Sequence, residues 1–351
     1  MAERTTAAIL VQTGQPLELM DVTLPALKPG QLIVDIAYSG VCQTQLNEAR
    51  GHKGPDRFLP HALGHEGSGI VREVSPEVTK VKPGDRVVLS WLKGSGLDVP
   101  GTVYEGAIGK INSGAISTFM TATVTCENRV TKIPDDMPLK EAALLGCAIP
   151  TGAGVVLNSI KLQAGQSLAV YGVGGIGLSA VMAAAALGGS PIIAIDVTPE
   201  KLALAKILGA THTINPLETD PVAMVRELTG GKGVDAALEA AGNTEVMELA
   251  FESVRNGGGV CFIAGNAPYG HTLRINPFSL IAGKVLKGTW GGDGQIDADI
   301  PRYVEMFTQG RLALDLLAKD VYDLTGINQA LDDLEARKVT RAMIDMGTGL
   351  A

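Results

Sequence analysis

The chain has 351 residues, which is more than a single hydrophobic core usually holds and enough for two domains of ordinary size. Its formal net charge is −8 without a concentrated tract of Lys or Arg, which argues against nucleic acid and anionic membranes as partners and favours a small-molecule substrate. The 44 glycines and the few aromatic residues (2 Trp, 6 Tyr and 6 Phe) indicate many tight strand-to-helix turns, which is typical of an α/β protein.

Two segments and the cysteines bear on where the protein works. Residues 1–14 lack the basic start, the long apolar stretch and the cleavage site of a secretory signal, so we expect a cytoplasmic protein. Residues 167–190 are apolar enough to suggest a membrane span, but their glycines cluster where a strand would lead into a helix, so we expect buried structure and no membrane partner. The four cysteines are too scattered for a disulfide framework, which leaves reduced thiols or metal ligands.

In chain order, the N-terminal part predicts a mostly β region. Short runs rich in β-branched and aliphatic residues are separated by turns that contain Pro and Gly, such as KPG. These runs cover residues 7–11, 32–38, 69–74 and 86–90.

From about residue 153 the pattern changes to alternating strands and helices, which indicates βαβ units and a parallel sheet. Strand-like runs such as SLAVYG, PIIAID and GGVCFIAG alternate with helix-like runs such as PEKLALAKILG. The final stretch returns to mixed elements, with an amphipathic segment around IPRYVEMFTQG and a last helix near GINQALDDLEARK. We therefore predict a doubly wound parallel-sheet domain joined to a mainly β domain.

A glycine-rich turn, YGVGGIG, follows the strand SLAVY and opens an Ala-rich helix. The first glycine permits the tight turn, the second admits a pyrophosphate against the N–H groups at the helix N-terminus, and the third lets helix and strand pack closely. Such a triplet alone could be a packing turn, but here strand, glycines, helix, strand and acid occur in the order of a dinucleotide site. The residues that we expect to bind the dinucleotide here are Gly172, Gly174, Gly175, Ile176 and Gly177.

Asp196 ends the next strand, 19 residues after Gly177, and is expected to accept hydrogen bonds from both ribose hydroxyls. This carboxylate would repel the 2′-phosphate of NADP, for which a basic pocket is typical. The neighbouring sequence AIDVTPEK offers only Lys201, whose alternative role is that of a solvated helix residue. We therefore predict NAD as the coenzyme.

Three scattered stretches carry metal-capable residues: Cys42 in GVCQTQ, His65 with Glu66 in LGHEGSG, and Cys147 in LLGCAIPTG. Each has an ordinary alternative, because cysteine is often a small buried residue and a histidine is often only hydrogen-bonded. Together, two thiolates and an imidazole could form the open zinc site of a catalyst, whereas a structural zinc site would have four protein ligands. Spacing alone leaves these alternatives open.

The ordered motifs resemble the zinc-dependent alcohol dehydrogenase family of the medium-chain dehydrogenase/reductase superfamily, over nearly the whole chain. The motifs that carry the resemblance are GVCQTQ, GHEGSGIV, VKPGDRVV, LLGCAIPTG, GVGGIG with Asp196, and RAMIDM. The resemblance implies a GroES-like catalytic domain over residues 1–152, completed by 292–351, and a Rossmann NAD-binding domain over 153–291. It places the active site in the cleft between these two domains.

The resemblance also implies that Cys42, His65 and Cys147 bind one catalytic zinc ion per subunit, with Glu66 as an occasional ligand or a close neighbour of one. A zinc ion held by two thiolates and a neutral imidazole would let a bound alcohol lose its proton, so that NAD could accept the hydride. The expected reaction is the reversible oxidation of a primary or secondary alcohol or polyol to the aldehyde or ketone.

By its position in the family motif, Thr44 resembles the hydroxyl residue that passes the substrate proton outward, although it could simply cap a helix. Many family members continue this relay with a histidine where Asn47 stands here, and an amide cannot take up a proton. His52 is a candidate substitute, with direct transfer from the ribose hydroxyl to water as the alternative. Gln45 replaces a common aspartate that orients the zinc histidine, so we expect a slightly weaker imidazole donor.

Many family members bind a second, structural zinc through four cysteines in the segment that here covers residues 89–120, which contains none. We therefore expect this zinc to be absent. Trp91 in the same segment could line the substrate pocket or belong to the core. Cys126 and Cys261 are interpreted as core thiols, and His61 as a loop residue.

Arg341 resembles a C-terminal arginine that pairs with the coenzyme pyrophosphate, with a surface cation as the alternative. The family implies a homodimer or homotetramer formed through the coenzyme domain, here around LIAGKVLKGTWGG. Two other functions stay open: a zinc-free, NADPH-dependent quinone or enoyl reductase on the same scaffold, and a nucleotide-binding sensor without catalysis. The presence of Cys42, His65 and Cys147 argues against both.

Overall fold

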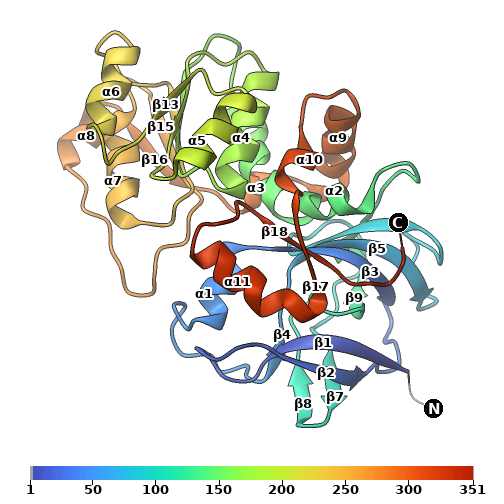
Figure 1. Cartoon of the computed structure of the whole chain (residues 1–351). Helices are drawn as coiled ribbons and strands as arrows, with labels where there is room; N and C mark the ends of the chain where they lie inside the picture. The colour runs from blue at the N-terminus through green and yellow to red at the C-terminus, as the bar shows by residue number, and fades with distance from the viewer. Residues whose placement is uncertain (1–2, 351) are drawn as a thin grey trace. The chain divides into compact units, whose positions relative to one another are not determined.

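The computed structural model describes residues 3–350, which divide into two compact units (Figure 1). The first unit comprises the described residues up to Cys147, the segment Gln295–Glu305 and the described residues from Leu314 onward. The second unit comprises Ala148–Gly294 and Met306–Ala313. The first unit is thus built from both ends of the chain.

The first unit is mainly β, as predicted. Five strands close on themselves in the order β1-β2-β7-β8-β4, and a second sheet runs β10-β6-β5-β3-β18-β17, with β9 also paired to β3. The strands of the closed set are β1 (Arg4–Leu10), β2 (Glu18–Thr23), β7 (Val103–Gly106), β8 (Gly109–Asn112) and β4 (His61–Ala62). Those of the second sheet are β10 (Val130–Lys132), β6 (Arg86–Ser90), β5 (Glu66–Val74), β3 (Gln31–Val41), β18 (Ala342–Asp345), β17 (Asp320–Asp323) and β9 (Ala122–Cys126).

Strand β3, QLIVDIAYSGV, organises the second sheet because nine of its eleven residues are buried. Near-continuous apolar character of this kind is typical of a strand covered on both faces. It pairs antiparallel with β5, β9 and β18, and Val41 lies opposite Ala342 of β18. The end of β3 therefore brings Cys42 close to the C-terminal strand, 300 residues away in the sequence.

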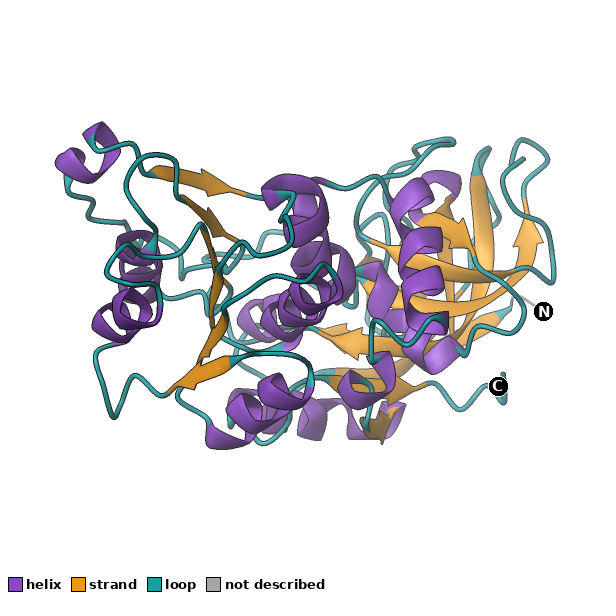
Figure 2. Ribbon diagram, turned by 90° about the horizontal axis from the view of Figure 1, so that it is seen from above, coloured by secondary structure: helices purple, strands orange, loops and turns teal. Residues whose placement is uncertain are grey.

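The second unit is a six-stranded parallel sheet in the order β13-β12-β11-β14-β15-β16. Renumbered within the sheet this is 3-2-1-4-5-6, the doubly wound order of the Rossmann fold, so the predicted fold class is confirmed. Figure 2 shows helices on both faces of this sheet. The strands are β11 (Leu168–Tyr171), β12 (Ile192–Ile195), β13 (His212–Ile214), β14 (Ala236–Glu239), β15 (Val260–Ile263) and β16 (Val285–Gly288). The helices are α3 (Ala148–Gly154), α4 (Gly175–Ala186), α5 (Pro199–Ile207), α6 (Pro221–Leu228), α7 (Thr244–Ser253) and α8 (Pro277–Ile281).

Local sequence signals account for several helices. Helix α6 begins at Pro221, whose missing N–H costs nothing in the first turn, and the Asp220 side chain accepts from Val222 N at 2.9 Å. Helix α11 (Ile327–Glu335) of the first unit buries Ile327, Ala330, Leu331 and Leu334, the i, i+3, i+4, i+7 stripe of an amphipathic helix.

One expectation about these elements is wrong, and two others are confirmed. His61 was interpreted as a loop residue, but it lies in strand β4 and is buried, because β4 pairs with both β1 and β8. The amphipathic segment expected around residues 300–310 is confirmed as helix α9, which runs from Ile296 to Thr308. The interpretation of Cys126 and Cys261 as core thiols is confirmed, since both are buried and free.

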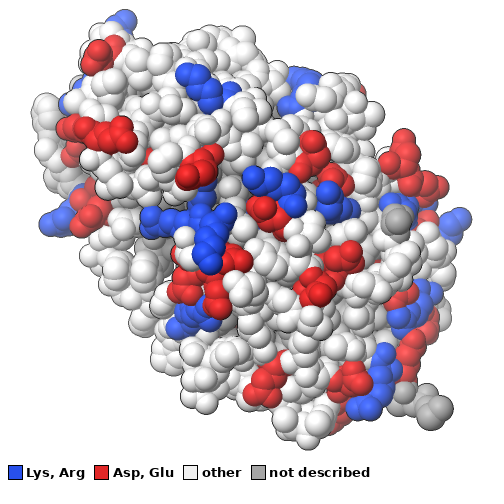
Figure 3. All heavy atoms as spheres, in the orientation of Figure 1, with Lys and Arg blue, Asp and Glu red and all other residues white. Residues whose placement is uncertain are grey.

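The face drawn in Figure 3 carries acidic and basic side chains close to one another, and neither sign covers an extended area there. Within residues 3–350, no single helix is long and apolar enough to cross a membrane, although one bent helix pair passes the same test on length and composition alone.

Candidate active site

Three metal-capable side chains of the first unit converge from distant parts of the chain. Cys42 follows β3 directly, His65 precedes β5, and Cys147 follows a short 3-10 turn after helix α2 (Leu139–Ala143). Their donor atoms, two Sγ and one imidazole nitrogen, all lie within 4.8 Å of one another. His65 Nε2 lies 3.2 Å from Cys147 Sγ. The structure thus brings together the three residues that the sequence singled out.

The surroundings favour the ionised form of Cys42. The pKa of the Cys42 thiol falls well below its ordinary value. The contact with Cys147 has the largest effect and lowers this pKa, whereas burial raises it. His65 and the positive charge of Arg341 lower the pKa further. Thiolates are the form in which cysteine binds metals. Two thiolates and one imidazole match the donor set of a catalytic zinc centre, in which three protein ligands leave a fourth position open.

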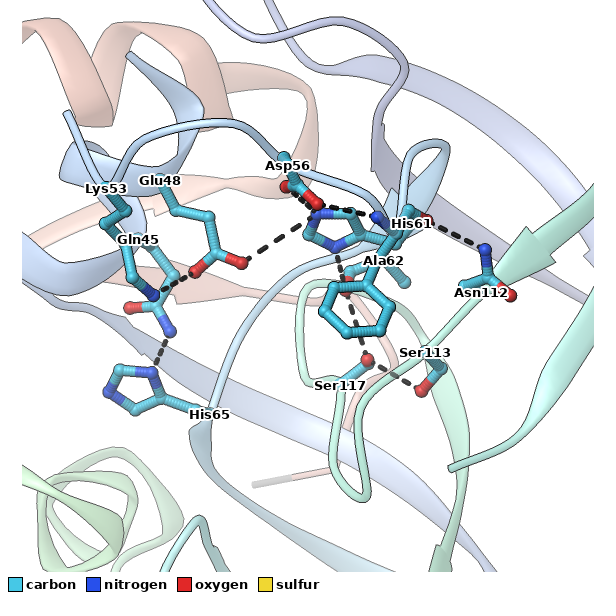
Figure 4. A network of polar contacts seen from close by, with 11 residues as sticks. Gln45, Glu48, Lys53, Asp56, His61, Ala62, His65, Asn112, Ser113 and Ser117 are labelled. Carbon is cyan, nitrogen blue, oxygen red and sulfur yellow. Dashed lines mark hydrogen bonds and ion pairs between the residues drawn. The ribbon is translucent and has the colours of Figure 1, made fainter. Parts of the chain in front are cut away.

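Gln45 orients this cluster from helix α1 (Gln43–Ala49), where its side chain is buried. Its Oε1 accepts from the Cys42 N–H at 3.2 Å, and its side-chain nitrogen contacts His65 Nδ1 (Figure 4). A partner on Nδ1 fixes the plane of the imidazole, which here directs Nε2 toward Cys147. The amide therefore takes the place that a carboxylate would occupy beside a zinc histidine.

Glu66 and Arg341 form an ion pair beside Cys42, with side chains 0% and 4% exposed. The pairing of β18 with β3 delivers Arg341 to this position, and Gly40 of β3 leaves room, since a Cβ there would overlap the Glu66 carboxylate. The alternative interpretation of Arg341 as a surface cation is therefore wrong. The sequence did not predict this pair, because no local signal links Glu66 at the start of β5 with Arg341 just before β18.

Trp91 and the residues considered for a proton relay lie around the cluster in different ways. Trp91 is half-buried and its ring meets that of His65 edge-on, with centroids 6.5 Å apart and planes at 63°. Thr44 is half-buried on helix α1, two residues after Cys42. His52 is exposed just beyond this helix, and its main-chain N–H donates to Asn47 O at 2.8 Å.

The glycine turn of the second unit has the geometry that its sequence predicts. Gly172 has φ of +86°, and a Cβ there would lie 2.7 Å from Ala241 N. A Cβ on Gly177 would overlap Gly172 O, so this position requires the close packing of helix α4 on β11. Gly174 precedes the first turn of α4 and faces open space, which leaves the backbone there accessible to a phosphate.

Asp196 follows β12 directly, beside this turn. Its carboxylate accepts from Val173 N and from Thr198 N, both at 2.9 Å, and the side chain is half-buried. The acid is thereby held at the turn with oxygen lone pairs available to hydroxyl groups. Lys201 lies on helix α5 and is half-buried.

Two families of known domains match the chain. The alcohol dehydrogenase GroES-like domain matches residues 28–135, and the zinc-binding dehydrogenase domain matches residues 175–309. The S-(hydroxymethyl)glutathione dehydrogenase of Paracoccus denitrificans is 32% identical, covering 97% of this chain and 99% of that protein. The alcohol dehydrogenase class-3 of Cereibacter sphaeroides is 31% identical over the same shares.

Solved structures agree with these matches. A zinc-binding-domain alcohol dehydrogenase protein from Burkholderia ambifaria is 32% identical, with a TM-score of 0.90 over 98% of this chain and 99% of that chain. Benzyl alcohol dehydrogenase from Acinetobacter calcoaceticus is 30% identical, with a TM-score of 0.89 over 98% of this chain and 100% of that chain. The likeness thus extends over both units.

Proposed function

Because the chain belongs to the zinc-dependent alcohol dehydrogenases of the medium-chain dehydrogenase/reductase superfamily, we propose that Cys42, His65 and Cys147 hold its catalytic zinc, one ion per chain at this centre. The observation that carries the proposal is the convergence of two sulfurs and one imidazole nitrogen within 4.8 Å. The enzyme interconverts an alcohol and the matching carbonyl compound with a nucleotide coenzyme.

The side chains of this centre have separate tasks. Zinc, when bound, supplies the Lewis acid that favours loss of the alcohol proton and polarises a carbonyl. Cys42 and Cys147 contribute the two negative charges that balance it, and Gln45 keeps the His65 ring turned toward Cys147. Trp91, whose ring lies edge-on to His65, is proposed to line the substrate pocket. Glu66 is proposed as an occasional ligand when its pairing with Arg341 loosens.

We propose that Thr44 passes the substrate proton outward from the first turn of helix α1. The exposed imidazole of His52 then accepts it in place of the amide of Asn47, which cannot. Direct transfer from the coenzyme ribose to water is the alternative route.

The coenzyme proposed is NAD. Gly172, Gly174, Gly175, Ile176 and Gly177 would receive its pyrophosphate at the N-terminus of helix α4, with Arg341 as a further contact. Asp196 would accept from the ribose hydroxyls and repel a 2′-phosphate, with Lys201 as the nearest candidate cation on helix α5.

As functional domains we propose residues 1–152 with 292–351 for catalysis and 153–291 for the coenzyme.

We also propose that the four-cysteine structural zinc site of many family members is missing, since residues 89–120 contain no cysteine. The four free thiols favour a reducing compartment, and we propose the cytoplasm.

A homodimer or homotetramer is proposed through the edge strand β16, because Phe278, Ile281 and Trp290 beside it are 68%, 79% and 74% exposed. Exposed apolar area of this kind marks an association surface.

The test combines metal content with turnover. Purified protein should contain one more zinc per chain than the Cys147→Ser variant, and should raise the absorbance at 340 nm with NAD and an alcohol. The alcohols should include benzyl alcohol and S-(hydroxymethyl)glutathione, after the names of two of the relatives. Equal zinc in the two proteins, or turnover that the substitution leaves intact, would contradict the proposal.

A further inference from the structure

A second cluster of metal-capable side chains lies outside the proposed zinc centre, in the same unit. Glu48 comes from helix α1, Asp56 from the loop that follows it, and His61 from strand β4 (Figure 4). Their donor atoms lie within 4.8 Å of one another. The side chains of His61 and Asp56 are 8% and 11% exposed, so two of the three donors are largely withdrawn from water.

The contacts of the His61 ring point to a cation. Nδ1 lies 3.3 Å from the Ala62 carbonyl oxygen, which also accepts from the Ser117 hydroxyl at 3.3 Å. Each ring nitrogen thus faces an oxygen that accepts, and a neutral ring has only one hydrogen to donate. When Nδ1 donates to the carbonyl, the lone pair of Nε2 faces Asp56 Oδ2 at 2.8 Å and Glu48 Oε1 at 3.8 Å. A metal ion at Nε2, or a second proton on the ring, satisfies both sides together.

We propose that Glu48, Asp56 and His61 bind a divalent cation of the kind that prefers nitrogen and oxygen ligands. One imidazole and two carboxylates are a donor set for such ions, with water completing the coordination. The Phe58 N–H donates to Asp56 Oδ1 at 2.8 Å, which favours the ionised form of this carboxyl group. The arrangement therefore supplies two negative charges and one neutral donor.

The other charge facing this cluster is that of Lys53, whose Nζ lies 3.0 Å from Glu48 Oε2. Lys53 is 49% exposed, so its flexible side chain can turn into solvent when an ion takes up Glu48. The bound ion would tie the loop around Asp56 and strand β4 to helix α1, the helix that carries Gln45. We therefore expect the cation to stabilise the segment that orients the zinc ligands.

The oxygen-rich cluster can be distinguished from the thiolate centre by the choice of metal. Mn²⁺ favours carboxylate oxygen over thiolate, whereas zinc accepts sulfur readily. The zinc-loaded protein is titrated with Mn²⁺ while the electron paramagnetic resonance signal of the free aqua ion is followed. We expect one Mn²⁺ per chain, and a binding constant weakened at least about tenfold in Asp56→Asn and in His61→Gln, since even residues that only contact a ligand have effects of this size.

The matched control is His212→Gln, which removes an exposed histidine of the second unit and should bind Mn²⁺ like the unchanged protein. Mn²⁺ should also raise the unfolding temperature of the unchanged protein and leave that of Asp56→Asn unaltered. Asp56→Asn keeps the side-chain shape, so loss of binding with unchanged circular dichroism is assigned to the ligand. Absence of Mn²⁺ binding by the unchanged protein would overturn the proposal and make a proton on Nε2 the positive species. Binding that both Asp56→Asn and His61→Gln retain would overturn it as well.

Discussion

At the scale of single residues, the ion pair of Glu66 and Arg341 is the most consequential contact beside the proposed zinc centre. Both side chains are almost fully buried, and the positive charge of Arg341 contributes to the low pKa of the Cys42 thiol. A buried ion pair adds little to stability over well-packed apolar residues, but removing one partner leaves an uncompensated charge. The pair therefore constrains both the fold and the electrostatics of the cluster.

We predict that Glu66→Gln and Arg341→Met each lower the free energy of unfolding by about 3–5 kcal/mol, because each leaves one charge buried alone. The double variant Glu66→Gln/Arg341→Met should lose less than the sum of the two single losses, since it removes both charges. Urea denaturation of the four proteins measures these values. Strictly additive losses would show that the two groups do not act as a pair.

The proposed preference for NAD also rests on one residue, Asp196. Replacing Asp196 by Asn keeps the size of the side chain and removes its charge. We predict that the ratio of kcat/KM for NAD to kcat/KM for NADP falls about 10- to 100-fold. A change of this size corresponds to the free energy of one or two hydrogen bonds to a charged group. Steady-state kinetics with both coenzymes measure the ratio. An unchanged ratio would mean that the Asp196 carboxylate, held beside Val173, does not distinguish the ribose hydroxyls of NAD from the 2′-phosphate of NADP.

At the scale of elements, strand β14 of the second unit ends in a buried acid. Glu239 Oε1 accepts from the N–H groups of Ala241 and Gly242 at 2.8 and 2.6 Å, which shapes the turn packed against Gly172. Burial raises the pKa of the Glu239 carboxyl while these N–H groups lower it, and the balance is a value of about 7. The end of β14 therefore titrates near neutral pH.

The raised pKa of Glu239 makes the folded protein less stable as the pH rises. In the unfolded chain the carboxyl loses its proton near pH 4.5, whereas in the folded chain it does so near pH 7. The folded state thus binds the extra proton between these values, and its stability falls from about pH 4.5 to about pH 7. We predict that Glu239→Gln removes this part of the dependence of unfolding free energy on pH, which amounts to about 3 kcal/mol by pH 8. Urea denaturation at pH 5 and pH 8 measures the unfolding free energy of the unchanged protein, of Glu239→Gln and of the control Glu227→Gln, which replaces an exposed acid. The same change in free energy between the two pH values in all three proteins would contradict the prediction.

The elements also show what local sequence can and cannot predict. The glycine turn and β12 were predictable because periodicity and turn residues are local signals, and the backbone at Gly172 has the positive φ that its place requires. Strand β4 was missed because its two residues carry no period and exist only through pairing with β1 and β8. The partner of Arg341 was likewise unpredictable, since it depends on the register of β18 against β3.

At the scale of the whole molecule, the proposed oligomer depends on the open edge of the parallel sheet. Strand β16 ends the sheet, and Phe278 and Ile281 of helix α8 are exposed beside it. We predict that Phe278→Asp/Ile281→Asp converts the oligomer into monomers, because two charges on each copy would be buried in the interface. Light scattering after size exclusion measures the mass. The control is Leu217→Asp, 77% exposed in the loop after β13; an unchanged mass in the double variant would contradict the assignment of this edge.

We propose that Cys42, His65 and Cys147 share one zinc ion with a position left for substrate, and the ligands of this ion can be measured. X-ray absorption at the zinc edge, on protein carrying one equivalent of zinc, reads the ligand set directly. We predict two sulfur neighbours at about 2.3 Å and nitrogen or oxygen neighbours at about 2.0–2.1 Å. Four sulfur neighbours, or none, would show that zinc is not held by Cys42, His65 and Cys147.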